Sequence, residues 1–225
     1  MKKFTPVQEE LALQLFDIGA VKFGAFELKL HETQPDAPLS PIYFNLRTPD
    51  NPKPGPLIPA VMELIGRVMY GEESRVRLGA SYEYIAGIPN AGDPFARAFC
   101  EASPWGIRRD QLRYFEKAHD GEMRQIGQLI GVVRSGCDVL LIDDLLTKAD
   151  TKLEAMQSVR ATGAKVYGVL VLIDREQGGK KQLEKAWCPS HAIYKLSDLL
   201  DLYYDRGRIS LATADEILDY IKANS

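Results

Sequence analysis

The chain begins with an amphipathic pattern of helical period. Thr5 is a candidate helix cap, and Gln8, three residues later, completes a capping box. Pro6 fits the first turn, where its missing N–H is not needed, and Gly19 is a candidate helix end. These signals predict a first helix, along which the apolar residues share one face: Val7, Leu11, Leu15 and Ile18.

Strand and helix patterns alternate with proline-rich loops over the next fifty residues. Residues 21–29 alternate in polarity, which predicts an edge strand or a hairpin, and residues 42–46 predict a second strand. The polar, proline-rich segments 31–40 and 48–56 are typical of loops. Apolar positions return at helical spacing over residues 57–71, so a helix is predicted there.

Three short, continuously apolar strands are predicted in the rest of the chain, each followed by a helical pattern. The strands are residues 84–88, 139–142 and 166–173, and the helices run through residues 95–99, 152–162 and 179–186. Strands of this kind are typical of a parallel sheet that is covered on both faces. The order strand, helix, strand, helix predicts an α/β fold with an open, mostly parallel sheet flanked by helices. Residues 197–223 predict one or two surface helices.

Composition narrows the class of protein. The chain has 225 residues, 45% hydrophobic and 26% charged, so residues 1–225 are expected to form a single domain. A net charge of −3 argues against a nucleic-acid partner bound through its phosphates. No apolar run approaches 18 residues and no signal peptide is recognised, so no membrane partner is expected. The three cysteines lack CxxC spacing, which favours a reducing cytoplasmic location over a disulfide framework or a zinc site.

Polar residues follow each of the three apolar strands. They are residues 89–92 (PNAG), Asp143 with Asp144, and residues 174–179 (DREQGG). In open α/β sheets, ligands bind at the carboxyl ends of the strands. One edge of the sheet would then hold carboxylates, a turn, an arginine and the start of a helix. Such a set could bind a polyanion, with a metal or sugar hydroxyls held by the carboxylates. Taken alone, each of these polar segments also has a purely structural interpretation, since paired acids often cap a helix or line a solvated turn. No GxGxxG follows a strand, which disfavours a dinucleotide fold.

A resemblance to a known family rests on these residues. Asp143 and Asp144, between a VLLI strand and a threonine-initiated loop, resemble the phosphoribosyl pyrophosphate signature of type I phosphoribosyltransferases. Residues 22–29, 40–47 and 174–179 resemble orotate phosphoribosyltransferases, and the matches run in order over residues 15–200. The resemblance implies a type I phosphoribosyltransferase-like sheet with a small N-terminal hood, in which residues 1–56 include the base-binding region.

The resemblance also implies an activity and a set of roles. Orotate and phosphoribosyl pyrophosphate would give orotidine 5′-monophosphate and pyrophosphate in de novo pyrimidine biosynthesis, with Mg²⁺ as cofactor and a homodimer as the working form. The implied roles are Lys29 and Arg175 at the orotate end, Tyr43 and Phe44 on the pyrimidine plane, Asn90, Ala91 and Gly92 at the pyrophosphate, Asp143 and Asp144 at the ribose hydroxyls, and Thr147, Lys148 and Thr151 at the 5′-phosphate. No residue is assigned as a protein ligand of the metal.

One departure from the family lies in its mobile catalytic loop, which corresponds to residues 113–121. Aligned on Gly121, the cationic residues Arg113, Lys117 and His119 each lie one position early. Two interpretations stay open. The loop slides and Lys117 and His119 remain catalytic, with Arg113 on the substrate, or the loop no longer serves catalysis.

A second departure lies in the 5′-phosphate loop. The family places glycine and small residues where Lys148, Ala149 and Asp150 stand. A non-glycine residue with positive φ costs about 1–3 kcal/mol, and Asp150 adds a negative charge beside a phosphate. Thr151 and Glu154 form a predicted capping box, so the helix start is expected to survive.

The departures leave three functions to weigh. The first is an active orotate phosphoribosyltransferase with divergent loops. The second is a catalytically impaired paralogue that binds orotate or a nucleotide in a regulatory role. The third is an enzyme for a different base. Loss of orotate absorbance in the presence of phosphoribosyl pyrophosphate and Mg²⁺ discriminates the first from the others.

Overall fold

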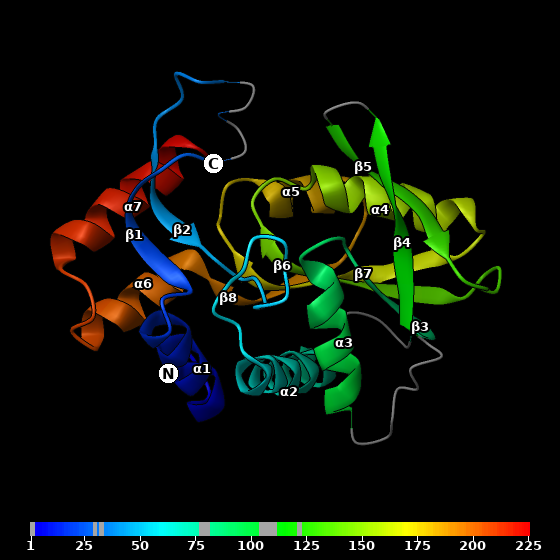
Figure 1. Ribbon diagram of the computed structural model, residues 1–225, viewed down its shortest axis with the longest axis horizontal. Coiled ribbons are helices and arrows are strands. Elements are labelled where there is room, and N and C mark those ends of the chain that lie inside the picture. Colours follow the sequence, from blue (N-terminus) through cyan, green and yellow to red (C-terminus); the bar gives the residue numbers. More distant parts are fainter. Residues whose placement is uncertain (1–2, 29–30, 32–33, 77–81, 104–111, 121–122) are drawn as a thin grey trace. The chain divides into compact units, whose positions relative to one another are not determined.

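The computed structural model (Figure 1) describes residues 3–28, 31, 34–76, 82–103, 112–120 and 123–225. The chain divides into two compact units. Residues 1–59 and 196–225 form the terminal unit, and residues 60–195 form the sheet unit. No helix in the described part of the chain is long and apolar enough to cross a membrane.

The described residues of the terminal unit form three helices and a two-stranded ribbon. They are α1 (Pro6–Asp17), β1 (Val21–Phe26), β2 (Ser40–Phe44), α6 (Leu196–Asp205) and α7 (Leu211–Ala223), and β1 pairs antiparallel with β2. The predicted capping box is confirmed, because Gln8 N donates to Thr5 Oγ1 at 3.3 Å while Thr5 N donates to Gln8 Oε1 at 2.9 Å. Gly19 has a φ of 71° in the turn after α1, a conformation that favours glycine.

Both ends of the chain meet in the terminal unit. Tyr203 of α6 donates its buried hydroxyl to the Ala12 carbonyl of α1 at 3.0 Å. Phe16 packs its ring 5.1 Å from that of Tyr203. At the surface, Lys3 pairs with Asp198 at 2.8 Å. The C-terminal helices predicted from the sequence therefore help to build the unit that also holds β1 and β2.

The sheet unit is built on six strands in the order β5-β4-β3-β6-β7-β8. The strands are β3 (Tyr84–Gly87), β4 (Leu112–Asp120), β5 (Met123–Ile130), β6 (Asp138–Leu146), β7 (Lys165–Asp174) and β8 (Ser190–Lys195), and the helices are α2 (Pro59–Val76), α3 (Gly92–Ala102), α4 (Asp150–Ala161) and α5 (Gly179–Lys185). All neighbouring strands are parallel except β4 and β5. The predicted open, mostly parallel α/β sheet is confirmed.

Helices cover both faces of this sheet. Figure 1 shows α4 and α5 on one side and α2 and α3 on the other. Leu141 and Val169 of the strands belong to one buried cluster with Ala155, Met156 and Val159 of α4. Because successive residues of a strand point to opposite faces, this cluster fixes which side chains of β6 face α4.

The direction of the connections reverses between β3 and β6. From β3 the chain passes through α3 to β4, and from β6 it passes through α4 to β7 on the opposite side. The two strands are hydrogen-bonded neighbours, so their carboxyl ends form a topological switch point. Ligands of open α/β sheets bind in the crevice at such a point.

Close packing of α2 on α3 gives a test of the fold. A Cβ added at Gly66 of α2 would overlap the Ala98 carbonyl of α3. We expect Gly66→Ala to destabilise the protein by about 1–3 kcal/mol through overpacking, less the roughly 1 kcal/mol that alanine gains in helix propensity. Urea unfolding measures the difference.

Gly71 provides the matched control in the same helix. A Cβ there would meet nothing within 4 Å, so Gly71→Ala should stabilise the protein by up to about 1 kcal/mol. Equal effects of the two substitutions would contradict the close approach of α2 to α3.

Candidate active site at the switch point

The PNAG segment forms a tight turn against β6. Ile88 N donates to Ile142 O at 2.8 Å, and Gly92 N donates to Ile88 O at 2.8 Å. A Cβ at Gly92 would overlap Ile142 O and lie 3.2 Å from Asp143 Oδ1. Glycine therefore lets the start of α3 lie directly on β6. Helix α3 begins at Gly92, three residues before the predicted start at Phe95, because the turn closes immediately after the strand.

The acidic pair lies inside β6. The sequence predicts that the strand ends at Ile142, but β6 continues to Leu146 because β7 is long enough to keep pairing, as Leu146 with Asp174. Asp143 points toward the α4 face with Leu141, and Asp144 points to the other face. The two carboxylates therefore have different surroundings.

Asp143 is bound inside the protein. Only 4% of the residue is exposed. Its Oδ1 accepts from Asp144 N at 2.9 Å, and its Oδ2 lies 2.6 Å from Lys152 Nζ in α4. Lys152 Nζ also donates to Leu145 O at 2.6 Å. Strand β6 and the start of α4 are thus joined by one buried ammonium.

Asp144 is partly exposed, and its Oδ1 accepts from Leu145 N at 2.7 Å. Burial and the neighbouring Asp143 carboxylate raise the pKa of Asp144 to about 8, against the opposing effect of Lys152. This carboxyl group therefore differs from Asp143 in orientation, and its pKa lies above that of an ordinary aspartate.

The raised pKa of Asp144 predicts a pH-dependent stability. The native state holds a proton that the unfolded chain releases at about pH 4, so the free energy of unfolding should fall as pH rises from about 5 to 8. The slope is at most about 1.4 kcal/mol per pH unit for one proton. Urea unfolding at several pH values measures this dependence. The free energy of unfolding should fall less steeply with pH in Asp144→Asn, and as steeply as in the wild type in the exposed control Asp215→Asn.

The loop from Thr147 to Thr151 is held by its neighbours and needs no glycine. Ala149 N donates to Gln182 Oε1 of α5 at 2.6 Å, and Gly179 N donates to Thr147 O at 2.9 Å. Ala149 is buried with a φ of −99°, and among the described non-glycine residues only Glu176 and Trp187 have positive φ. The expected strain at this loop is therefore absent.

The helix after the loop starts two residues earlier than predicted. The cap residue is Ala149, without a side-chain cap bond, so the capping box at Thr151 is wrong and Thr151 lies within the first turn. The helix begins early because Leu153 N already bonds to Ala149 O at 2.8 Å. The first-turn N–H groups have no intrahelical acceptor, as in any α-helix. Asp150 and Lys148 are exposed, and Asp150 makes no side-chain bond within the described residues.

The DREQGG segment packs on this loop. Arg175 N donates to Leu146 O at 2.8 Å, and Asp174 Oδ1 accepts from Glu176 N at 2.8 Å. A Cβ at Gly179 would lie 2.8 Å from Thr147 O. Arg175 is only 5% exposed. Arg175 follows the end of β7 at Asp174, as the sequence predicts. The expectation that it lies outside the core is wrong, because the segment folds back against the end of β6.

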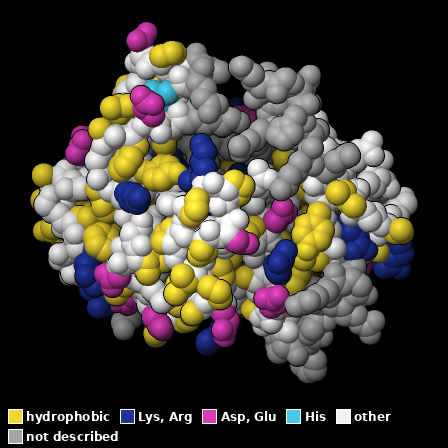
Figure 2. Space-filling view, in the orientation of Figure 1, with side chains coloured by type: hydrophobic (Ala, Val, Ile, Leu, Met, Phe, Trp, Pro, Cys, Tyr) yellow, Lys and Arg dark blue, Asp and Glu magenta, His cyan; other side chains and the backbone are white. Residues whose placement is uncertain are grey.

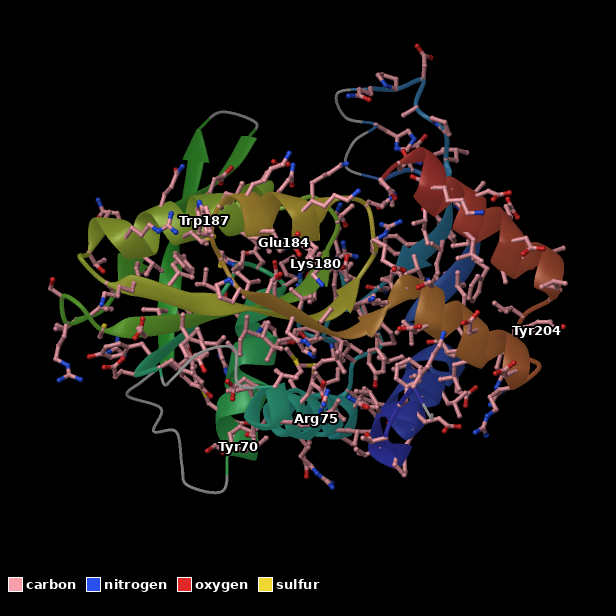
Figure 3. The ribbon with its side chains drawn as sticks, turned by 180° about the vertical axis from the view of Figure 1, so that it is seen from behind. Tyr70, Arg75, Lys180, Glu184, Trp187 and Tyr204 are labelled. Atoms are coloured by element: carbon pink, nitrogen blue, oxygen red, sulfur yellow. The ribbon has the colours of Figure 1, made fainter. Side chains whose placement is uncertain are left out.

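Helix α5, which follows, presents one side to solvent. Figure 3 shows Lys180 and Glu184 along this helix, with Trp187 just beyond its end. Trp187 is 93% exposed. Gln182 is partly buried and reaches Ala149 of the loop from Thr147 to Thr151, so α5 supports that loop with its other side.

The segment predicted as a catalytic loop is a β-ribbon. Ala86 of β3 pairs with Arg113 of β4, and β4 then continues past the end of β3. Lys117 and His119 pair through their backbones with β5, and their side chains lie outside the described residues. The loop assignment is therefore wrong, because β5 supplies an antiparallel partner for residues that are too polar to predict as a strand. Figure 1 shows the ribbon projecting beyond the end of β3.

Arg113 is placed at the base of this ribbon. Its guanidinium lies 4.3 Å from the centre of the Tyr84 ring and donates to Val132 O at 2.8 and 3.1 Å. These contacts join β4 to β3 and to the end of β5.

Three residues predicted to contact the base belong to the terminal unit. Lys29 lies outside the described residues. Tyr43 is partly exposed, accepts from Arg47 Nη1 at 2.8 Å, and lies 5.5 Å from the Phe26 ring. Phe44 is 5% exposed and belongs to the core of its unit.

Comparisons with known proteins decide the family. No family model matches the chain. It is 31% identical to the orotate phosphoribosyltransferase of Pyrobaculum aerophilum over 211 residues, which are 92% of this chain and 96% of that protein. The chain belongs to the orotate phosphoribosyltransferase family. The family predicted by resemblance is thereby confirmed.

Two longer proteins of related name are also similar. The chain is 26% identical over 217 residues to the uridine 5′-monophosphate synthase of Bos taurus, covering 96% of this chain and 41% of that protein. The solved structure of the UMP synthase of Leishmania donovani matches with a TM-score of 0.74 and 28% identity, covering 96% of this chain and 42% of that one. The chain thus spans about two fifths of the length of these two proteins.

In this orotate phosphoribosyltransferase homologue, the sheet unit gathers most of the predicted site at one edge. The residues brought to the switch point or the loop beside it are Asn90, Ala91, Gly92, Asp143, Asp144, Thr147, Lys148, Thr151 and Arg175. Sequence reasoning missed Lys152 and Gln182. Lys152 was assigned to the interior of a capping box, and nothing local connects Gln182 with Ala149, 33 residues away.

Proposed function

We propose that the chain is an orotate phosphoribosyltransferase, which transfers the phosphoribosyl group of phosphoribosyl pyrophosphate to orotate in pyrimidine biosynthesis. One observation carries the proposal. The turn at Gly92, the acid Asp144 and the start of α4 share a single switch point in a member of this family. A sugar that bears a phosphate at one end and a pyrophosphate at the other requires such a set of groups.

The phosphoribosyl pyrophosphate site is assigned from its three chemical parts. The 5′-phosphate lies at the start of α4, where Thr147 and Thr151 flank N–H groups and the positive end of the helix dipole. The ribose hydroxyls lie at Asp144, since a carboxylate accepts two hydrogen bonds. The pyrophosphate lies at residues 89–92, where the backbone is close because Gly92 has no side chain.

Catalysis is assigned to positioning and charge. As the pyrophosphate leaves, positive charge develops on the ribose and negative charge on the leaving group, and fixed groups of opposite charge lower this barrier. Lys117 and His119 are proposed to meet the leaving pyrophosphate from the β4–β5 ribbon. Arg113 is proposed to support the ribbon from its base, where it already contacts Tyr84 and Val132.

Magnesium is proposed as a cofactor that the substrate brings. Within the described residues, no three side chains of His, Cys, Asp or Glu are grouped so as to hold a metal ion. This fits Mg²⁺, which in such sites keeps several waters and takes one or two carboxylates beside substrate phosphates. Asp144 would be that carboxylate and would release its proton as the ion binds, and the ion would neutralise charge on the pyrophosphate.

Each unit is proposed to hold its own candidates for contact with orotate, which are Arg175 in the sheet unit and Tyr43 and Lys29 in the terminal unit. The guanidinium of Arg175 suits a carboxylate because its planar fork forms two parallel hydrogen bonds. The Tyr43 ring offers an aromatic face to the flat pyrimidine. Phe44 is proposed to support Tyr43 from within the core of the terminal unit.

The alternative of an impaired regulatory paralogue has a specific structural signature. In it, the Asp150 carboxylate would occupy the phosphate position and accept the N–H groups of the helix start. Asp150 is exposed, and the start of α4 has no side-chain cap bond. The arrangement therefore favours a loop that is open to a phosphate.

The protein is further proposed to act as a cytoplasmic homodimer with small-molecule substrates only. Cys100, Cys137 and Cys188 are free and buried, which suits a reducing compartment. On the face in Figure 2, described side chains of both charges are interspersed. Light scattering of the purified chain tests the dimer.

The decisive experiment is an activity assay. The purified chain, orotate, phosphoribosyl pyrophosphate and Mg²⁺ should lose orotate absorbance and release pyrophosphate in equal amounts. Binding of orotate by calorimetry without turnover would support the regulatory paralogue instead. Turnover of another base in place of orotate would support the third alternative.

A further inference from the structure

Lys152 is an unusual residue for the place that it occupies. It is the third residue of α4, in the first turn, where the helix dipole disfavours a positive charge. Its side chain is nevertheless turned inward and is only 7% exposed. Burial of an ammonium is costly unless it is paired and hydrogen-bonded. The two contacts at 2.6 Å, with Asp143 Oδ2 and Leu145 O, satisfy that condition.

The same contacts decide what Asp143 is able to do. Its Oδ1 is held by Asp144 N and its Oδ2 by Lys152, and its side chain is only 6% exposed. Gly92 of the turn is also close, since a Cβ added there would lie 3.2 Å from both the Cα and the Oδ1 of Asp143. A sugar hydroxyl would therefore have to displace a buried ion pair in order to reach Asp143. Asp144 is partly exposed and points to the opposite face of β6.

We propose that Lys152 is a positioning residue of the phosphoribosyl pyrophosphate site, which holds Asp143 within the protein and leaves Asp144 as the member of the acidic pair that meets the substrate. This inference rests on the proposed function. It divides the pair into a structural and a ligand-facing acid.

The contacts of Lys152 with Asp143 and Leu145 also explain how a loop without glycine keeps its shape. Lys152 links the start of α4 to Leu145 and Asp143 of β6, across the loop that connects them. Gln182 holds the middle of the same loop through Ala149 N. The first-turn N–H groups of α4 are thereby fixed relative to Asp144. Some residues hold a ligand-binding group in place without contacting the ligand. Their removal typically changes affinity or activity by 10- to 100-fold.

The test is a double-mutant cycle with Lys152→Met and Asp143→Asn. Isothermal calorimetry with phosphoribosyl pyrophosphate and Mg²⁺, without orotate, measures binding apart from turnover. We expect Lys152→Met to raise the dissociation constant about 10- to 100-fold and to lower the melting temperature by roughly 10 °C, because Asp143 is left buried without its partner. Lys152→Arg should recover part of the affinity and part of the melting temperature. The exposed control Lys165→Met should change neither the affinity nor the melting temperature.

The double variant Asp143→Asn/Lys152→Met decides between positioning and direct contact. Removing both charges leaves no unpaired ion, so its melting temperature and affinity should exceed those of Lys152→Met. Asp144→Asn should weaken binding by about 100-fold or more, in the wild type and in the double variant alike. If Asp143 contacts the substrate directly, the double variant will bind no better than Asp143→Asn, and this would overturn the inference.

The failure of the proposed function would look different. A wild-type protein that neither binds phosphoribosyl pyrophosphate nor consumes orotate overturns the function and the inference together. A wild-type protein that does both, while the double variant shows no recovery over either single variant, overturns the inference alone.

Discussion

Replacing Arg175 by lysine is expected to raise the dissociation constant for orotate by roughly 10- to 100-fold. Hydrogen bonds to a charged group contribute about 1.5–3 kcal/mol, and lysine cannot reproduce the planar, bidentate fork that arginine offers to a carboxylate. Arg175 lies at the end of β7, beside the loop at Thr147, and is almost completely buried. Lysine is a better probe than alanine, which would leave a cavity in this packed region and confuse binding with stability.

Calorimetry with orotate in the presence of pyrophosphate measures the effect of Arg175→Lys. The matched control is Arg160→Lys on the exposed last turn of α4, which should leave affinity unchanged. Circular dichroism and the melting temperature show whether the fold is kept. An unchanged orotate affinity in a folded Arg175→Lys variant would remove Arg175 from the base site.

The fold was predictable where the sequence signal is local. The capping box at Thr5 depends on residues three positions apart, and the structure confirms it. The apolar runs of β6 and β7 are recognised because both faces of a central parallel strand are buried. Gly163 ends the pattern of α4 and has a φ of 81°, a conformation that glycine adopts without strain.

The strands that were missed depend on distant partners. β4 and β5 carry many charged residues and become strands by pairing with each other, while only the start of β4 pairs with β3. β8, at the other edge, is formed by pairing with β7. Edge strands tolerate polar residues on both faces, so hydrophobic periodicity does not report them.

The candidate site likewise has a part that the sequence predicts and a part that depends on distant contacts. The strand-end rule brings residues 89–92, the acidic pair and Arg175 to one edge without any knowledge of side-chain contacts. It treats Asp143 and Asp144 as equivalent, because adjacent residues at a strand end look alike in the sequence. Their difference comes from Lys152, whose ammonium reaches back nine residues along the chain. No periodic or capping rule describes that contact.

Gly92→Ala is expected to lower kcat/KM for phosphoribosyl pyrophosphate by roughly 100-fold. The added Cβ would overlap the Ile142 carbonyl and crowd Asp143 Oδ1, at 3.2 Å. The carbonyl belongs to a central strand and also accepts from Ile88 N, so it cannot move aside. The turn must move instead, and a displacement of about 1 Å at a reacting group is enough for a loss of this size.

The effect of Gly92→Ala on stability should be smaller than its effect on activity. Overpacking typically costs about 1–3 kcal/mol, which a chain of this size can tolerate in part. Steady-state kinetics with varied phosphoribosyl pyrophosphate, together with urea unfolding, separates the two effects. Gly71→Ala is the control for a glycine substitution in open space. If Gly92→Ala lost stability and kept its kcat/KM, residues 89–92 would be a structural turn, and the pyrophosphate would have to lie elsewhere along the edge.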